Sequence, residues 1–365
     1  MGHYKNPYFF GGVEISNYEL YKRLSLHGNK ITILSSKYTG FRNYEVNENF
    51  DYFFVGYAFG KKRSALAFPL SSFITAAKIC RSYDILVEDL TVLGPSFSFL
   101  LQKKKPVILR IHDFTDLTTF TRKNGFLIGP CFYGNMRIYP RFFKNWIVVS
   151  NTFNARFGIN GRVIGNGIDE QMLEAIQKKG DYIAYIGRFD LVKKGLDILI
   201  EALDILREKG WLMKNNLKLR MAGQGQDKEK LLKIISQKKL SHLIDMVGWV
   251  EGREKTRFIE NAEFLVMPSR YEGQPITSLE AGACYKPVIV SDIPELSHVV
   301  KQGYGQSFKS FSPEELSKKM RYFHERADVR EEMGIKGRKF AESNTWNHIM
   351  PIYEDYLRQM IREFT

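Results

Sequence analysis

Arg188 and Lys194 have the charge and the setting to bind a diphosphate. They lie in the segment from Gly187 to Gly195, which follows a predicted buried strand and opens a helix. Free backbone N–H groups and the helix dipole attract anions at such a position. The guanidinium adds a forked charge and the ammonium a point charge. A solvated loop that happens to be basic is the alternative interpretation of this segment taken alone.

Two carboxylates, Glu272 and Glu280, flank the start of another predicted helix. A strand ends near Met267, a loop then presents Glu272, and Pro275 begins a helix in which Glu280 lies about a turn and a half further on. Carboxylates accept hydrogen bonds from the paired hydroxyls of sugars and riboses. Glutamates eight positions apart are common by chance, so it is the setting between strand, glycine loop and helix that indicates a site.

A glycine turn and a histidine follow two further predicted strands. Gly223 and Gly225 come directly after the strand at 217–222, and His112 follows the strand at 107–111. Because ligands of open α/β sheets bind along the carboxyl edge, both positions are candidates for ligand contact. A plain strand-to-helix turn is the alternative for the glycines, and a histidine satisfied at a strand end is the alternative for His112.

Short apolar runs alternate with amphipathic helical patterns along the whole chain, which predicts parallel α/β architecture. The strands expected in the second half are 182–186, 217–222, 244–247, 264–267 and 288–290, and those expected in the first half are 30–34, 85–87, 107–111 and 146–149. A cluster of glycine and asparagine at 160–167 suits a hinge, and it places a domain boundary near 170–178. We therefore expect two doubly wound domains.

Length and composition agree with this organisation. The 365 residues exceed the roughly 250–300 at which single cores stop growing. Hydrophobic residues make up 44% of the chain, and no apolar run reaches the roughly 18 residues of a membrane span. The polar N-terminus and three scattered cysteines, Cys80, Cys131 and Cys284, predict a cytoplasmic protein with neither a disulfide framework nor a zinc site.

The net charge of +14 is concentrated in the first half. Residues 1–178 hold 23 Lys and Arg against 13 Asp and Glu, and the stretch 117–168 holds seven basic residues, interleaved with aromatics, and no carboxylate. Together with the lysine-rich runs at 61–63 and 103–105, this stretch suggests a peripheral contact with an anionic membrane surface or a lipid-linked anionic acceptor. A generally basic protein whose aromatics belong to the core is the alternative.

These segments, in this order, resemble the retaining GT-B glycosyltransferases of family four, the glycosyl transferases group 1, over nearly the whole chain. The resemblance implies that Glu272 contacts the transferred sugar and Glu280 the nucleotide ribose. It implies that Arg188 and Lys194 hold the donor diphosphate. The remaining residues that it assigns to the donor site are loop, turn and helix-start positions, namely Gly11, Gly12, Gly223, Gly225, Gly273, Gln274, Pro275 and Ile276.

The resemblance also assigns roles in the first half. The segment Gly11-Gly12-Val13-Glu14 matches a loop that approaches the donor phosphate and precedes a helix over 15–26, and His112 matches a histidine that faces the transferred sugar. The chain departs from the family pattern at two places. Only residues 1–4 are available for the strand that normally precedes the glycine pair, so we expect either that this strand is shortened or that it begins upstream. Gln274 stands where an apolar residue is usual.

The implied fold is two Rossmann-like domains facing across a cleft, with an N-terminal acceptor-side domain at 1–172, a donor-binding domain at 173–342 and a closing helix within 343–365. The implied reaction is metal-independent transfer of a sugar, with retention, from a UDP-sugar or GDP-sugar to an unnamed acceptor. The resemblance implies no cofactor. A sugar-nucleotide epimerase of the same fold, a basic nucleic-acid-binding protein and a non-enzymatic sugar-nucleotide sensor are the alternatives.

Overall fold

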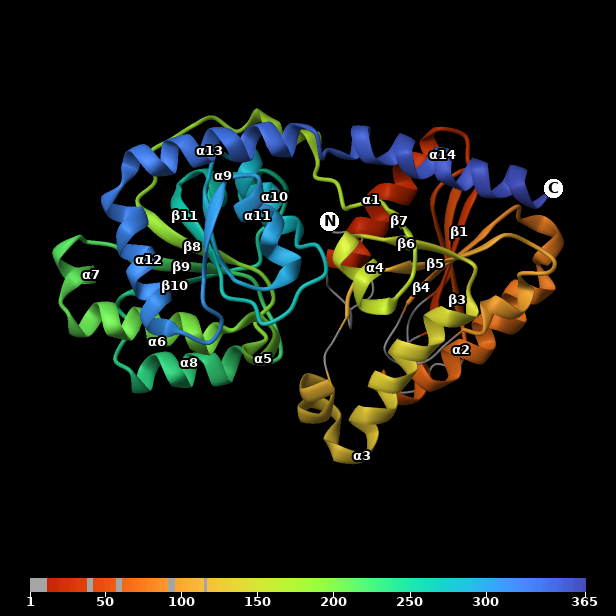
Figure 1. Ribbon diagram of the computed structural model, residues 1–365, viewed down its shortest axis with the longest axis horizontal. Coiled ribbons are helices and arrows are strands. Elements are labelled where there is room, and N and C mark those ends of the chain that lie inside the picture. The colour runs from red at the N-terminus through yellow and green to blue at the C-terminus, as the bar shows by residue number, and fades with distance from the viewer. Residues whose placement is uncertain (1–11, 38–41, 57–60, 91–95, 115–116) are drawn as a thin grey trace. The chain divides into compact units, whose positions relative to one another are not determined.

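The computed structural model describes the chain except residues 1–11, 38–41, 57–60, 91–95 and 115–116 (Figure 1). It forms two compact units. Unit 1 comprises Met1–Asn166 together with Trp346–Thr365, and unit 2 comprises Gly167–Thr345. Contacts thus divide the chain at 166/167 and 345/346, whereas the sequence suggests limits at 172 and 342.

Unit 2 is built on a six-stranded parallel sheet with the strand order β10-β9-β8-β11-β12-β13. The strands are β8 (Tyr182–Ile186), β9 (Lys218–Ala222), β10 (Ile244–Gly248), β11 (Ala262–Met267), β12 (Val288–Ser291) and β13 (Gly305–Phe308). From β8 the chain first adds β9 and β10 on one side, and it then returns to add β11, β12 and β13 on the other side of β8. The carboxyl ends of β8 and β11 therefore form the switch point at which open α/β sheets bind ligands.

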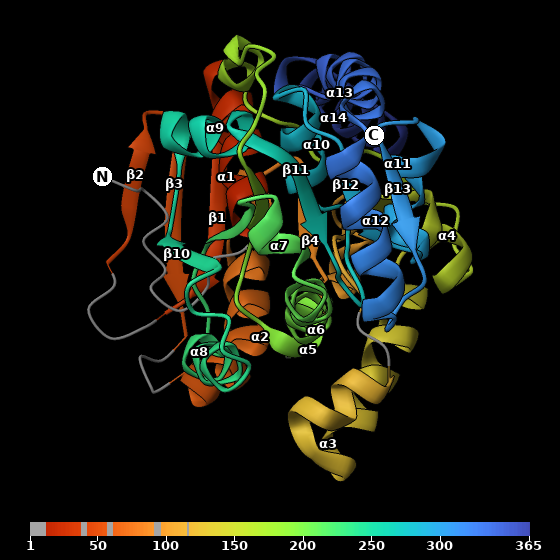
Figure 2. The same ribbon diagram turned by 90° about the vertical axis from the view of Figure 1, so that its left-hand side faces the viewer.

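Helices cover both faces of this sheet (Figure 2). One face carries α6 (Leu196–Glu208), α8 (Lys228–Gln237) and α12 (Pro313–Glu325), and the other carries α9 (Gly252–Glu260), α10 (Ile276–Ala283) and α13 (Ala327–Glu342). Shorter helices are α5 (Leu191–Lys194), α7 (Trp211–Lys214) and α11 (Ser297–Lys301). Side chains alternate along β8, with Ile183 and Tyr185 in one core and Tyr182 and Ala184 in the other. Burial on both faces explains why these strands read as continuous apolar runs.

Close backbone contact fixes the position of α10, the helix that carries Glu280. A Cβ added to Gly282 would lie 2.6 Å from the carbonyl oxygen of Gly337 on α13, and one added to Gly334 would lie 2.3 Å from that of Tyr285. Only glycine permits such an approach. The two helices therefore pack backbone to backbone behind the switch point.

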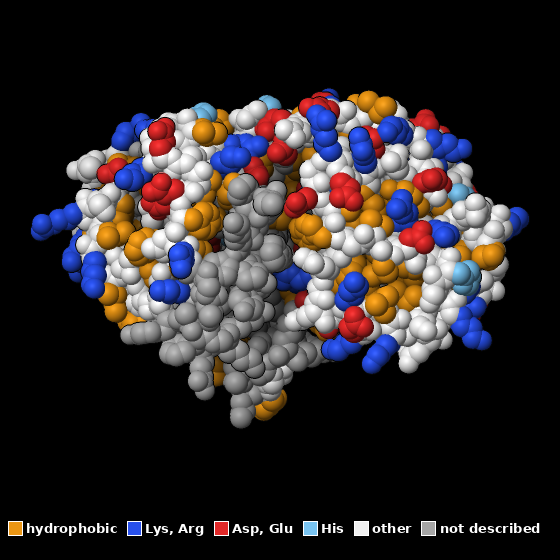
Figure 3. Space-filling model, turned by 180° about the vertical axis from the view of Figure 1, so that it is seen from behind, with side chains coloured by type: hydrophobic (Ala, Val, Ile, Leu, Met, Phe, Trp, Pro, Cys, Tyr) orange, Lys and Arg blue, Asp and Glu red, His pale blue; other side chains and the backbone are white. Residues whose placement is uncertain are grey.

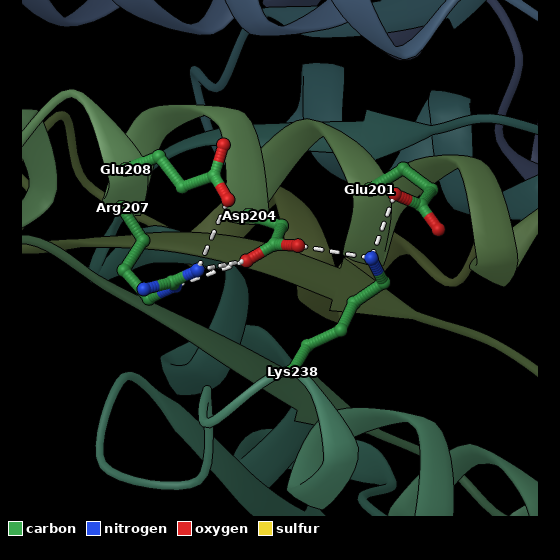
Figure 4. A network of polar contacts seen from close by, with 5 residues as sticks. All are labelled: Glu201, Asp204, Arg207, Glu208 and Lys238. Carbon is green, nitrogen blue, oxygen red and sulfur yellow. Dashed lines mark hydrogen bonds and ion pairs between the residues drawn. The ribbon is translucent and has the colours of Figure 1, made fainter.

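A network of charged side chains fastens α6 to the end of α8 on the outer surface of unit 2 (Figure 4). The Lys238 ammonium lies 2.9 Å from carboxylate oxygens of both Glu201 and Asp204, and Arg207 donates to Asp204 at 2.7 and 2.9 Å. Partial burial acts to raise the pKa of Asp204, but hydrogen bonds from Lys238 and Arg207 lower it. This network supports the fold and lies on α6 and α8 rather than at the switch point.

Unit 1 contains two separate sheets among its described residues. One has the order β1-β3-β2 with β2 antiparallel, and the other is the parallel sheet β4-β5-β6-β7. The strands are β1 (Ile31–Ser36), β2 (Tyr44–Asn47), β3 (Phe50–Val55), β4 (Leu86–Asp89), β5 (Val107–Ile111), β6 (Asn145–Val148) and β7 (Arg162–Val163). A cavity of about 1190 Å³ is lined by the whole of both β1 and β4. The strand expected at residues 1–4 lies outside the described residues.

The helices of unit 1 differ in one place from the sequence expectation. They are α1 (Gly12–Leu26), α2 (Lys61–Lys78), α3 (Leu117–Ile138), α4 (Asn151–Phe157) and α14 (Trp346–Phe364). The helix expected to begin at Ile15 begins at Gly12, so Val13 and Glu14 lie in its first turn rather than in a loop. No helix among the described residues combines the length and apolarity of a membrane span.

The aromatic residues of the basic stretch 117–168 serve mainly as core. Phe143 is buried, and Phe132, Tyr133 and Trp146 pack against the same cluster, whereas Phe142 is 52% exposed. On the face of the molecule shown in Figure 3, basic and acidic side chains are interspersed. The side chains at 61–67 are not described. These observations favour the core interpretation for most of the aromatics.

The last helix, α14, belongs to unit 1, where it packs on α1 and the parallel sheet. Trp346, Ile349, Met350 and Tyr353 share a buried cluster with apolar residues of α1, β5 and β6. Tyr353 is fully buried, and the guanidinium of Arg110 lies 5.2 Å from the centre of its ring. The C-terminal segment is therefore part of the core of unit 1.

We expect Tyr353→Ala to destabilise unit 1 by about 3–5 kcal/mol, because it removes a large buried aromatic ring and leaves Arg110 without its ring contact. Ile352→Ala is the matched control on the same helix, since Ile352 is 43% exposed, and it should cost under about 1 kcal/mol. Native-state hydrogen exchange of unit 1 amides measures both. Equal losses would contradict the assignment of α14 to this core.

Candidate functional site

The sequence-predicted charged residues of unit 2 converge on the switch point. Arg188 and Lys194 follow β8, Glu272 follows β11, and Glu280 lies in α10, the helix that follows Glu272. These two strands are neighbours at the centre of the sheet although about 80 residues separate them along the chain. The doubly wound topology is therefore what brings the residues together.

Lys194 and Glu272 form a direct ion pair. The Lys194 ammonium lies 2.5 Å from Glu272 Oε1, and the Ser269 hydroxyl donates to the same oxygen at 2.6 Å. Glu272 is 5% exposed, so its carboxylate would be costly to bury without such partners. The ion pair therefore holds the Lys194 ammonium directly beside the Glu272 carboxylate.

The short helix α5 presents Lys194, and side chains hold it at its start. Asp190 caps the helix by accepting a hydrogen bond from the Lys193 amide at 2.8 Å, and Asp227 accepts one from the Leu191 amide at 3.0 Å. Gly195 ends α5 with φ +60°, and a Cβ there would lie 2.0 Å from the carbonyl oxygen of Pro268. The loop after β8 is thereby pressed against the loop after β11.

Arg270 ties these two loops together. Its guanidinium donates to the carbonyl oxygens of Leu191 and Val192 at 2.8 and 3.0 Å, and it forms a two-pronged ion pair with Asp197 at 2.9 and 2.5 Å. The two carbonyls belong to α5, so the arginine also satisfies backbone acceptors that a short helix leaves open. Sequence reasoning missed Arg270, because its partners lie 73–79 residues away.

Arg188 lies just after β8 at the carboxyl edge of the sheet, and its side chain is exposed. A hydrogen bond holds its backbone in place, because the hydroxyl of the buried Tyr185 donates to the Arg188 carbonyl oxygen at 2.9 Å. Burial raises the pKa of Tyr185 well above its ordinary value, and the nearby carboxylates of Glu272 and Asp190 raise it further. Tyr185 therefore stays a neutral hydrogen-bond donor beneath the site.

The glycine turn at Gly223 and Gly225 packs against the backbone of the Arg188 loop. A Cβ on Gly223, at φ +140°, would lie 1.9 Å from the Gly187 carbonyl oxygen, and one on Gly225 would lie 2.3 Å from that of Phe189. The Phe189 amide donates to the carbonyl oxygen of Gln224 at 2.9 Å. Loop packing therefore requires glycine at both positions, which the sequence spacing alone does not reveal. Contact of these glycines with a nucleotide stays a prediction.

Glu280 has a lysine partner that sequence reasoning missed. The Lys255 ammonium, on α9, lies 2.6 Å from Glu280 Oε1, and Glu280 is 6% exposed. The pattern around Lys255 reads only as the polar face of an amphipathic helix, so nothing local marks it. The site therefore holds two buried carboxylates, each with one ammonium partner.

The loop between the carboxylates is close to the expected form. The first helical residue of α10 is Ile276, and Pro275 is the buried residue that precedes it, so the helix starts one position later than predicted. Gly273 and Gln274 are half-buried before it. Backbone N–H groups at this helix start stay candidates for anion contact.

The two candidates from the first half belong to unit 1, and a third lies outside the described residues. His112 follows β5 and is 5% exposed, with Nε2 2.9 Å from Asp89 Oδ1. Gly12 is the exposed first residue of α1, and a Cβ there would meet no atom within 4 Å. Gly11 is not described. Their proposed contacts with a donor stay predictions.

We expect Gly223→Ala to destabilise the protein by more than about 2 kcal/mol, because the added methyl group would collide with the Gly187 carbonyl oxygen at a backbone angle that favours glycine. Gly210→Ala is the matched control: Gly210 also has positive φ, +65°, but has open space around it, so only backbone strain of about 1 kcal/mol should appear. Urea unfolding compares the two. Losses of equal size would refute the packing role of the glycine turn.

Residues 169–340 match the family model of glycosyl transferases group 1. An uncharacterised glycosyltransferase from Methanocaldococcus jannaschii is 28% identical over 200 residues, which cover 53% of this chain and 53% of that relative. The chain spans about half or less of the length of the curated relatives with which it aligns.

Solved structures match much more of the chain. Sucrose-phosphate synthase from Thermosynechococcus elongatus superimposes with a TM-score of 0.78 and 16% identity over 97% of this chain and 94% of its own. Alr3699/HepE from Anabaena, solved in complex with UDP, gives a TM-score of 0.62 and 16% identity over 79% of this chain and 82% of its own. These likenesses confirm the predicted GT-B fold class, and residues 169–340 form a domain of the glycosyl transferases group 1 family.

Proposed function

We propose that the protein is a retaining glycosyltransferase of family four that transfers a sugar from a nucleoside diphosphate sugar. The observation that carries the proposal is the partly buried Lys194–Glu272 pair at the switch point, with 2.5 Å between its charged atoms. One member is suited to a phosphate and the other to a sugar hydroxyl. A sugar nucleotide presents both groups within one molecule.

Departure of the diphosphate is the step that these residues would assist most. Negative charge develops on the leaving phosphate, and cations fixed beside it stabilise the transition state more than the ground state. Lys194 is held by α5, and Arg188 reaches from a loop whose backbone is fixed by Tyr185. Positions that are set before the ligand arrives need little rearrangement during the reaction.

The two carboxylates would orient the donor. An ionised carboxylate offers about four lone-pair positions, so Glu272 and Glu280 can keep their lysine partners and still accept from hydroxyls. In our proposal Glu272 binds the transferred sugar and Glu280 the ribose, as the family resemblance implies. The acceptor then attacks from the face that the phosphate leaves, and a phosphate oxygen takes the proton of the attacking hydroxyl.

The donor base and the acceptor are proposed only by class. A structural neighbour was solved with UDP, which makes UDP-sugars the first to test, followed by GDP- and ADP-sugars. For the acceptor we propose a lipid-linked or other anionic glycan precursor at an anionic membrane surface, motivated by the excess of Lys and Arg over residues 1–178. Salt-reversible binding to anionic liposomes would support this acceptor class, and absence of binding at low salt would refute it.

We expect the matching sugar nucleotide to raise the melting temperature of the wild-type protein and to have little effect on Lys194→Met, because ligand binding stabilises the folded state according to occupancy. At a ligand concentration of about 100 times Kd the stabilisation is about 2.7 kcal/mol. Lys214→Met is the matched control, since Lys214 is exposed on α7. A panel of UDP-, GDP- and ADP-sugars measures the shift; an unchanged shift in Lys194→Met would refute the phosphate role.

Release of nucleoside diphosphate from the matching donor, measured in the presence of a membrane lipid extract, should fall about 100-fold or more in Glu272→Gln. It should persist in EDTA, because the proposed charge stabilisation comes from Arg188 and Lys194. Loss of activity in EDTA that Mg²⁺ restores would overturn metal independence. Conversion of the donor to an epimer without any acceptor would instead favour the epimerase alternative.

A further inference from the structure

The hydroxyl of Ser278, on α10, lies between two acceptors and has one proton to donate. Its oxygen is 2.9 Å from the carbonyl oxygen of Pro275 and 3.2 Å from Nε2 of His298, on α11. Ser278 is fully buried, so solvent does not compete for this proton. Glu280 follows two residues later in the same helix, so a contact that holds Ser278 also acts on the helix that carries Glu280.

The tautomer of His298 follows from its other nitrogen. Nδ1 lies 3.1 Å from the carbonyl oxygen of Glu295, and a carbonyl oxygen can only accept, so this hydrogen bond requires a proton on Nδ1. Burial lowers the pKa of His298, against the opposite effect of the hydrogen bond to that carbonyl. A neutral imidazole carries one proton, and Nε2 is therefore an acceptor that faces Ser278.

The partners of the two acceptors decide where the proton of Ser278 goes. The Pro275 carbonyl oxygen already accepts from the Ser278 amide at 3.2 Å, whereas Nε2 of His298 has no other donor among the described residues. Donation of the hydroxyl to His298 leaves neither acceptor without a partner, as is usual for groups inside a protein. A hydrogen bond from Ser278 to His298 therefore joins α10 to α11.

This bond and a backbone contact anchor the same face of α10. Ser278 and Gly282 are four residues apart, which brings them to within about 40° of each other around the helix, whereas Glu280, two residues from each, lies on the opposite face. Gly282 is held by its close approach to the backbone of α13, and Ser278 is held by His298. Rotation of α10 is thus restrained on both sides of Glu280, and the direction of Glu280 toward Lys255 depends on that rotation.

We propose that His298 is a positioning residue of the donor site, which acts through Ser278 to fix the rotation of α10 and with it the direction of Glu280. This inference rests on the proposed function for the ligand that Glu280 binds. The residue belongs to α11, which follows β12, and it acts without touching the ligand. Loss of the Ser278–His298 bond should weaken the contact of Glu280 with the ribose hydroxyls and leave the rest of the nucleotide bound.

The hydrogen bond is tested without any ligand. In protein labelled with ¹⁵N-histidine, side-chain NMR at neutral pH distinguishes protonated from unprotonated ring nitrogens, and the His298 signals are those lost in His298→Gln. We expect a protonated Nδ1 and an unprotonated Nε2, with the Nε2 signal moving in Ser278→Ala because it loses its donor. A proton on Nε2 in the wild type, or an Nε2 signal that stays in place in Ser278→Ala, would overturn the proposal.

The ribose contact is tested with ligand pairs that differ only in the hydroxyls. Calorimetry compares UDP, GDP and ADP with their 2′,3′-dideoxy forms. For the base that the wild type binds, we expect the ribonucleotide to bind about 10-fold or more tightly than the dideoxy form, the contribution of a hydrogen bond to a charged group. His298→Leu should reduce this preference to about 3-fold or less and leave the affinity for the dideoxy form unchanged. Equal weakening of both forms, or an undiminished preference, would contradict the positioning role.

A conservative variant separates the acceptor from the bulk of the side chain. In His298→Gln the amide oxygen reaches the level of Nε2 and can accept from Ser278, so the preference for the ribonucleotide should return to within about 3-fold of the wild type. A preference as low as that of His298→Leu would refute the acceptor role. Thermal unfolding verifies that each variant folds.

A double variant tests whether the two residues act as one unit. Ser278→Ala should lower the preference as much as His298→Leu, and the double variant should lose no more than either, because each change removes the same bond. The matched control is Ser317→Ala on α12: Ser317 is buried, and its hydroxyl donates to the carbonyl oxygen of Glu314, three residues earlier, at 2.8 Å. This control should keep the full preference. Losses that add in the double variant would show two separate effects and reject the proposed pathway.

The two levels of the proposal fail in different ways. If the wild type binds none of the three nucleotides, the proposed function fails. If it binds one of them without preferring the ribonucleotide, the assignment of Glu280 to the ribose fails. In both cases the NMR experiment still decides whether Ser278 donates to His298.

Discussion

The ion pair between Lys194 and the buried carboxylate of Glu272 is the interaction around which the two loops at the switch point are arranged. A carboxylate that is 5% exposed needs its partners, and Lys194 can reach it only if α5 is pressed onto the loop after β11. The caps of α5, the two-loop clamp of Arg270 and the missing Cβ of Gly195 all serve that contact. The residues Asp190, Gly195 and Arg270 thus all help to place the Lys194 ammonium beside the Glu272 carboxylate.

The second carboxylate repeats the arrangement on different elements. Glu280 is held by Lys255 of α9 and stands on α10, whose position is set by backbone contact with α13 at Gly282. The two pairs lie on elements that the doubly wound topology brings to one edge of the sheet. Each of the two buried carboxylates therefore has a cationic partner before any ligand binds.

Sequence reasoning succeeded where the signal was local. The central strands β5 and β8 have the predicted bounds, because strands buried on both faces read as unbroken apolar runs. It missed β2 and the short β13, whose sequences lack such runs, and also β3, although Tyr52 to Val55 form one. It singled out Arg188, Lys194 and Glu272 after strands and Glu280 in the following helix, and the structure brings these four to one edge of the sheet, while their ligand contacts stay predictions. It did not single out Arg270, Lys255 or Asp89, because the partner of each is remote in sequence. The sequence predicted a turn at Gly223 and Gly225, but it could not predict that these glycines approach the carbonyl oxygens of Gly187 and Phe189.

The most direct test of the central claim is the crystal structure of the protein with a bound nucleoside diphosphate. Our account predicts the diphosphate against Lys194 and Arg188 at the carboxyl ends of β8 and β11, with the ribose hydroxyls hydrogen-bonded to Glu280. A nucleotide bound elsewhere, with the Lys194–Glu272 and Lys255–Glu280 pairs untouched, would contradict it.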